Sequence, residues 1–172
     1  MIRKRKRYVR PKKLYEKSRI EEENKLAERY GLKNKHEIWK TLAKVSYFRR
    51  RAKALAKASR EEQEVLFAKL RALGLKTHTI ADVLALTLRD ILQRRLSTIL
   101  AEKKLASTIW QARQLIAHKH VRIFGKVVNV PSYLVLVDEE SAITVDAQKN
   151  EQKKQEPAQE KATEEAHEQT HA

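Results

Sequence analysis

Histidines and carboxylates are the residues of this sequence that could perform chemistry, and neither group is arranged as a site. His118 and His120 lie close in sequence, but two imidazoles make only half of a tetrahedral zinc shell. Asp138, Glu139 and Glu140 are adjacent where a turn is expected, which favours solvated acids over a catalytic pair. With no cysteine and 3 glycines, the sequence supports neither thiol chemistry nor a glycine-rich phosphate loop. We therefore expect no enzyme activity, no metal and no cofactor.

Cations dominate the sequence, and their chemistry is the binding of polyanions. The 172 residues include 38 Lys and Arg against 22 Asp and Glu, a formal charge of +16. Such an excess implies a nucleic acid or an anionic surface as partner. No apolar run approaches the ~20 residues of a membrane-spanning helix, and the first residues, MIRKRKRYVR, lack the apolar segment of a signal peptide. We expect a soluble, cytoplasmic protein that binds nucleic acid, with no membrane and no small-molecule substrate.

The most strongly patterned stretch runs from Thr87 to Val137 and must position many of these cations. Apolar residues recur at helical steps from Leu88 to Leu100, and Thr87 with Asp90 predicts a capping box at the start of that helix. Thr108 and Gln111 predict the start of a second helix. The period then changes to two around Gly125, which indicates a β-hairpin. Residues 133–137 are expected to form a further strand, and Ile143 with Val145 a final one.

The first half of the chain reads as helices. Capping patterns and terminal glycines predict helices that start at Ser18, Asn34 and Ser59, with ends marked by Gly31 and Gly74, and a brief helix over Ile80–Leu86. In the helix after Asn34 we expect Ile38, Leu42 and Val45 to form the buried stripe. The fold class is therefore mainly α with a small α+β module.

Composition divides the chain into four segments. Residues 1–17 form a basic arm that we expect to be flexible, and it begins with Arg3, Lys4, Arg5, Lys6 and Arg7. Residues 18–86 form a helical lobe, and residues 87–146 form the α+β module. Residues 147–172 are rich in Glu, Gln, Lys and Ala, have almost no apolar side chain to bury, and are expected to be disordered.

The α+β module carries a family resemblance. The motifs RRL, KKLA, QARQLI, HKHV, GKVVN and PSYLV, taken together, resemble the S-four-type RNA-binding domain. The upstream segment LRALGLKTHTIADVLALTLRDILQRRL is similar to what precedes that domain in the S-four family of small-subunit ribosomal proteins, of the archaeal and eukaryotic branch. One departure is Lys119, because the family often has glycine in that turn and lysine is strained there if the backbone is left-handed.

The resemblance implies a structural component of the small ribosomal subunit. Such a protein would bind a helical junction of small-subunit ribosomal RNA, nucleate assembly and support decoding accuracy. Its other partners would be neighbouring small-subunit proteins and messenger RNA near the path by which it enters. Arg95 and Arg113 match the family's RRL and AR motifs and are ranked first as RNA contacts. The other expected RNA-binding residues are Arg94, His118, Lys119, His120, Arg122 and Lys126 on the module, Arg49, Arg50 and Arg51 on the lobe, and Arg3, Lys4, Arg5, Lys6 and Arg7 on the arm.

Two alternatives from other classes stay open. The first is a free-standing RNA chaperone or ribosome-rescue factor with the same module, which would not need the arginine-rich helical lobe. The second, less favoured, is an RNA-modifying enzyme, because the module also occurs appended to such enzymes. That reading would require a catalytic domain, and the remaining residues contain no candidate site by the usual inspection.

Overall fold

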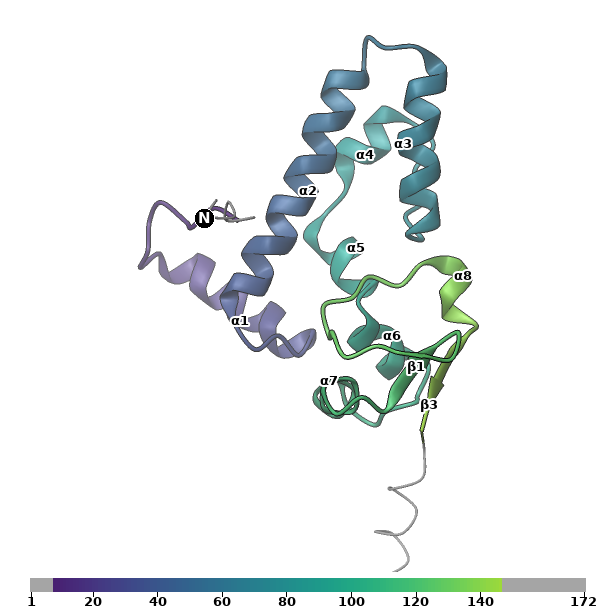
Figure 1. Cartoon of the computed structure of the whole chain (residues 1–172). Helices are drawn as coiled ribbons and strands as arrows, with labels where there is room; N and C mark the ends of the chain where they lie inside the picture. The colour runs from purple at the N-terminus through teal and green to yellow at the C-terminus, as the bar shows by residue number, and fades with distance from the viewer. Residues whose placement is uncertain (1–7, 147–172) are drawn as a thin grey trace, which may run out of the picture.

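The computed structural model describes residues 8–146, and this part of the chain has the mainly α-helical fold with a small sheet that the sequence predicts. The helices are α1 (Lys17–Arg29), α2 (Lys35–Leu55), α3 (Arg60–Ala72), α4 (Ile80–Ala85), α5 (Leu88–Gln93), α6 (Leu96–Glu102), α7 (Ile109–Ala117) and α8 (Val137–Glu140). The strands are β1 (Val121–Ile123), β2 (Lys126–Val127) and β3 (Ile143–Val145). In Figure 1, α2 and α3 extend to one end of the molecule, while α6, α7 and the sheet form the other. No helix within residues 8–146 is long and apolar enough to cross a membrane.

The helical lobe is organised around α2. Val45, Phe48 and Ala52 of α2 are buried and share one apolar cluster with Leu70 of α3 and Val83 of α4. The three α2 residues are spaced by three and four, so they lie on one face of the helix. Packing of α3 and α4 against that face leaves the opposite face of α2 open to solvent.

One residue expected in that stripe is not buried. Leu42 is 53% exposed, so its predicted place in the core is wrong. The buried residues of α2 instead run from Ile38 through Thr41 to Val45, at steps of three and four residues. Thr41 satisfies its hydroxyl locally by donating a hydrogen bond from Oγ1 to the Glu37 carbonyl oxygen at 2.8 Å, which lets a polar residue occupy a buried position.

The α+β module has its own core. Leu96 and Leu100 of α6, Ile116 of α7 and Val121 of β1 are fully buried in one cluster, which Val135 completes. The strands pair antiparallel in the order β2-β1-β3. The hairpin and the final strand expected from the sequence are thus confirmed as β1, β2 and β3.

The single helix expected from Leu88 to Leu100 is two helices. The capping box of Thr87 and Asp90 starts α5 as predicted, but α5 ends at Gln93 and α6 begins at Leu96. The break is stabilised from two sides. The Leu96 amide donates to the Tyr133 carbonyl at 2.9 Å, and the Thr98 hydroxyl donates to the Leu92 carbonyl at 3.0 Å.

The strand expected over residues 133–137 is also wrong. This segment instead pairs with the backbone at the break between α5 and α6. The Val135 amide donates to the Arg94 carbonyl at 3.0 Å, and Leu134 and Arg95 form an isolated antiparallel bridge. Because these hydrogen bonds are made to the break, the segment does not join the sheet, and α8 begins at Val137.

Four helices end in the same hydrogen-bonded turn with a left-handed residue after the C-cap. After α1 and α3 that residue is Gly31 or Gly74, with φ of 58° and 77°. After α6 and α7 it is Lys104 or Lys119, with φ of 58° and 65°. At each end the following residue donates its amide back across the turn, as His120 does to the Leu115 carbonyl at 3.0 Å. Lysine at this position costs about 1–2 kcal/mol relative to glycine, so the left-handed turn considered at Lys119 is present and strained.

Gly31 brings the helical lobe into contact with the module. A Cβ atom built on Gly31 would lie 2.5 Å from Ile109 Cγ2, at the first residue of α7. The turn between α1 and α2 therefore approaches α7 more closely than any side-chain-bearing residue would allow. By contrast, a Cβ on Gly125 in the hairpin would meet nothing within 4 Å.

We predict that Gly31→Ala is more destabilising than Gly125→Ala. Both residues are left-handed, with φ of 58° and 73°, so both variants incur a conformational cost of about 1–2 kcal/mol. Only Gly31→Ala adds a collision with Ile109, and we expect about 1–3 kcal/mol more loss of unfolding free energy from it. Urea denaturation of the two variants measures the difference. Equal losses would mean that the contact between Gly31 and Ile109 relaxes without cost.

Candidate nucleic-acid interface

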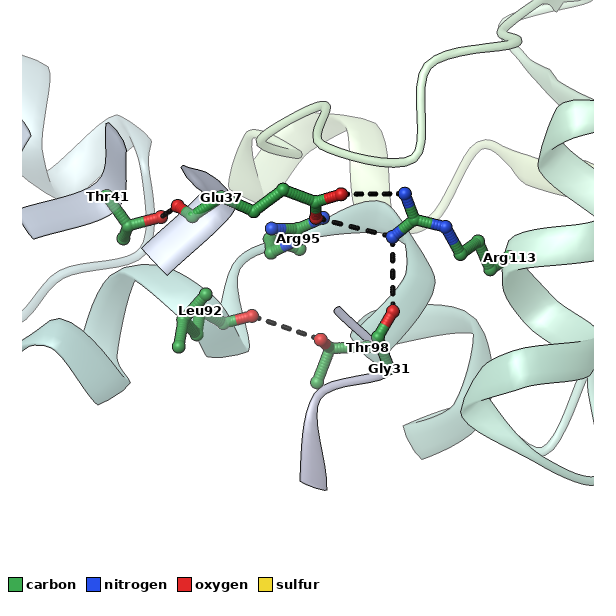
Figure 2. Close-up of polar contacts among 7 residues, drawn as sticks. All are labelled: Gly31, Glu37, Thr41, Leu92, Arg95, Thr98 and Arg113. Atoms are coloured by element: carbon green, nitrogen blue, oxygen red, sulfur yellow. Dashed lines mark hydrogen bonds and ion pairs between the residues drawn. The ribbon is translucent and has the colours of Figure 1, made fainter. Parts of the chain in front are cut away.

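One carboxylate joins the helical lobe to the two arginines that the sequence ranks first. Glu37, in the first turn of α2, accepts a hydrogen bond from Arg95 Nη2 to Oε2 at 2.6 Å and from Arg113 Nη2 to Oε1 at 2.7 Å. Arg113 Nη1 also donates to Glu37 Oε2 at 3.3 Å and to the Gly31 carbonyl at 3.1 Å. Figure 2 shows Glu37 lying between the two guanidinium groups. We call Glu37, Arg95 and Arg113 the bridge.

The bridge is largely removed from water. The side chains of Arg95, Arg113 and Glu37 are 4%, 19% and 17% exposed. Burial alone raises the pKa of Glu37, but the hydrogen bonds from Arg113 and Arg95 and their positive charges bring the net pKa below its usual value. Burial lowers the pKa of Arg95, and its contacts with Glu37 oppose that effect. A shared carboxylate thus holds two guanidinium groups in place at the joint.

Arg94 is also held inside the chain. Its Nη2 donates to the Val135 carbonyl at 3.0 Å, and its Nη1 forms an ion pair with Glu140 of α8. Arg94, Arg95 and Arg113 are therefore engaged in contacts within the protein. The Arg95 guanidinium is buried and paired with Glu37, so the structure gives it a contact within the protein, and its expected contact with RNA stays a prediction. Arg113 was expected to contact RNA at the surface. In the structure it faces the helical lobe and not open solvent.

The remaining predicted cations of the module lie at its surface. His118, Lys119 and Lys126 are exposed, and His120 is half-buried with its ring centroid 6.4 Å from that of His118. Arg122 is exposed and its Nε lies 3.1 Å from Asp146 Oδ2, with both side chains nearly half exposed. An exposed pair of that kind contributes little to stability. These residues lie in the turn after α7 and on the β1–β2 hairpin.

The three arginines of α2 form a second exposed group. Arg49 donates from Nη2 to the Leu86 carbonyl at 2.7 Å, so it also ties α2 to the residue after α4. Arg51 donates to the Tyr47 hydroxyl at 3.3 Å, while Arg50 is exposed on the same helix. All three lack an acidic partner among the ion pairs of residues 8–146. Arg3, Lys4, Arg5, Lys6 and Arg7, like the expected disordered tail over residues 147–172, lie outside the described residues.

The basic arm meets the lobe through aromatic contacts. Tyr8 lies edge-on to His36 with ring centroids 5.2 Å apart, and its ring centroid is 6.2 Å from that of Trp39. Trp39 donates from Nε1 to Glu23 Oε1 at 3.0 Å. Tyr8 thus has aromatic partners on the first turns of α2.

Sequence reasoning identified the arginines but missed Glu37 as their partner. Glu37 lies in the first turn of the helix predicted to start at Asn34, and it is separated from Arg95 by 58 residues and from Arg113 by 76. No local pattern marks so distant a pair. Within residues 8–146 no group of three or more His, Cys, Asp or Glu is placed to hold a metal ion. The surface chemistry of this part of the chain is therefore that of exposed cations around a fixed joint.

Comparisons with known proteins identify a matching domain family and similar proteins. A family model described as "S4 domain" matches residues 94–141. The chain is 43% identical over 145 residues to the "Small ribosomal subunit protein uS4" of Hyperthermus butylicus, covering 81% of this chain and 82% of that protein. It is 43% identical to the protein of the same name from Ignicoccus hospitalis, covering 81% and 87%. Its identity to the one from Saccharolobus solfataricus is 44% over 148 residues, covering 81% of each.

We predict that Glu37→Gln destabilises the protein in a pH-dependent way. The substitution leaves two largely buried arginines without a counter-charge, and we expect a loss of about 2–4 kcal/mol in unfolding free energy at neutral pH. Folding lowers the pKa of Glu37. The contribution of its carboxylate to the unfolding free energy is therefore complete above the unfolded pKa of about 4.3, and it disappears as the pH falls through the folded pKa. The gap between the parent and Glu37→Gln should therefore narrow in acid. Urea denaturation at a series of pH values measures it, and a gap independent of pH would contradict this origin.

Proposed function

This chain belongs to the family of small ribosomal subunit protein uS4, and we propose from that membership that it is a constituent of the small ribosomal subunit that binds its ribosomal RNA. The observation that carries the proposal is the 43% identity to a protein of that name over 81% of this chain. A structural role on the cytoplasmic ribosome, without catalysis, follows for this protein. Its formal charge of +16 suits a polyanionic partner.

The distribution of charges suggests which surface meets the RNA. Lys119 and Lys126 are exposed on the module, and His118 precedes Lys119 in the turn after α7. Arg50 and Arg51 form a second exposed cationic group on α2. Phosphate contacts from such side chains would fix the register of the protein, and RNA shape would supply most of the selectivity. The role of the bridge in this proposal is indirect, because it holds the module and α2 in one relative orientation.

Membership of the family also suggests more specific features of the proposed role. We propose binding at a helical junction of the RNA, an early step in subunit assembly, and support of decoding accuracy. Neighbouring small-subunit proteins and messenger RNA near its path into the subunit are the further partners. Reconstitution of small subunits with and without this protein tests the assembly role, since an assembly factor of this kind changes which proteins join afterwards.

A free-standing RNA chaperone with the same module is the alternative that the surface also fits. The two readings differ in stoichiometry. A subunit constituent sediments with small subunits in a one-to-one amount and remains there after a wash in moderate salt. A chaperone or rescue factor sediments in a smaller amount and is released. The arginine-rich helical lobe favours the first reading, because the module alone would serve a chaperone.

We predict that RNA affinity falls steeply with salt and that Lys119 contributes to the slope. If about six phosphates are neutralised, log K against log[salt] should slope near −4 to −5. Lys119→Gly removes one cation and relieves the left-handed strain at φ 65°. It should make the slope shallower by about 0.7–0.9 while raising the unfolding free energy by about 1 kcal/mol. Filter binding at several salt concentrations and urea denaturation measure the two effects.

Lys119→Arg is the matched control, because it keeps both the charge and the strain. It should bind with the parent's slope and unfold at the parent's midpoint. If Lys119→Gly gains stability but keeps the parent's slope, Lys119 is not at the RNA interface.

A further inference from the structure

Phe124 lies at the tip of the β1–β2 hairpin, where its ring does not pack into a hydrophobic core of the described residues. The strands pair Ile123 with Lys126, which leaves a loop of two residues, Phe124 and Gly125. The Phe124 side chain is 64% exposed and is not a member of any of the apolar clusters of residues 8–146. Its backbone amide donates to the Ala142 carbonyl at 3.4 Å, so the main chain of the tip is anchored to the turn before β3.

The backbone of this loop is unsuited to phenylalanine. Both loop residues have positive φ, 48° at Phe124 and 73° at Gly125, which is the pattern of a type I′ turn. Such turns prefer Asn-Gly or Asp-Gly, because a bulky side chain is strained at positive φ. Phe124 therefore opposes folding twice, through its backbone strain and through the exposure of an apolar ring. A residue of this kind in a functional module points to a contact made outside the chain.

One cation follows Phe124 in sequence, and a second contacts the segment that anchors the loop. Lys126 follows the loop and is exposed. Lys103, at the end of α6, donates from Nζ to the Glu140 carbonyl, close in sequence to the Ala142 that receives the Phe124 amide. Two of the three acids of α8 are already engaged. Glu139 accepts hydrogen bonds from the Tyr133 hydroxyl and the Leu136 amide, and Glu140 pairs with Arg94.

We propose that Phe124 stacks on an unpaired base of the RNA, with Lys126 and Lys103 contacting the flanking phosphates. An aromatic ring among cations matches the way proteins read single-stranded loops and bulges, where the ring takes the face of the base and the cations take the backbone. A protein partner with an apolar pocket fits less well, because the lysines would have to be desolvated with the ring. This inference rests on the proposed RNA-binding function and adds to it the class of element recognised, an unpaired nucleotide.

Phe124→Asn separates function from stability, because asparagine suits the turn. The probe is archaeal small-subunit ribosomal RNA transcribed in vitro, bound by the full chain. We expect Phe124→Asn to lower affinity about 5- to 100-fold, the range of a lost base–aromatic stack. Its urea midpoint should equal or exceed the parent's, and its salt slope should match the parent's because no charge is removed. Lys126→Gln should instead make the slope shallower by about 0.7–0.9.

Three companion variants complete the test. Phe124→Tyr keeps the aromatic face and should bind like the parent, whereas Phe124→Leu keeps an apolar side chain without that face and should bind like Phe124→Asn. Val65→Ala removes an apolar side chain that is 67% exposed on α3, and it should leave affinity unchanged.

The outcomes distinguish this inference from the function on which it rests. If the parent fails to bind the RNA, the proposed function fails. If the parent binds and Phe124→Asn binds equally well, the stacking contact is absent and the proposed function stands. A lower urea midpoint for Phe124→Asn would show that the ring supports the fold, and full affinity in Phe124→Leu would show an apolar contact without stacking. Either result overturns the inference.

Discussion

The shared carboxylate of Glu37 is the interaction on which the arrangement of this molecule depends. It accepts hydrogen bonds from Arg95 and Arg113, which belong to the module, while it is itself in the first turn of α2. Two guanidinium groups removed from water without a counter-charge would be costly, so the lobe and the module each complete what the other lacks. The close approach of Gly31 to Ile109 reinforces the joint by steric fit.

The cations of the module therefore fall into two groups, those bound within the chain and those exposed at its surface. Arg94, Arg95 and Arg113 are bound to carboxylates and carbonyls of the chain itself. Lys119 and Lys126 point outward, and Lys119 holds a backbone conformation that glycine would adopt at lower cost. Phe124 likewise has a positive φ, at which a bulky side chain is strained. Strain at exposed, left-handed positions of the module is consistent with selection for what these side chains contact rather than for the turns they form.

Local signals allowed much of the fold to be predicted, and long-range contacts explain what was missed. Thr87, Thr108, Gly74 and Gly125 mark boundaries that depend only on neighbouring residues, and the structure has helix starts or turns at each. The break before Leu96 depends on hydrogen bonds with Tyr133, whose carbonyl accepts from the Leu96 amide, and with Val135, whose amide donates to the Arg94 carbonyl. Both partners are far along the chain, so helical periodicity alone suggested one continuous helix. Local patterns likewise did not show that the lobe lies against Arg113, because its partner Glu37 is separated from it by 76 residues. The RNA contacts themselves remain predictions.

A double-mutant cycle between Glu37 and Arg113 tests the central claim most directly. Unfolding free energies of the parent, Glu37→Gln, Arg113→Met and the double variant give the coupling between the two side chains. If the carboxylate joins the lobe to the module, the coupling should be about 1–3 kcal/mol, the range for residues in one ion-pair network. A coupling below about 0.5 kcal/mol, the scatter for independent sites, would contradict the account and show that the two parts are held together without the bridge.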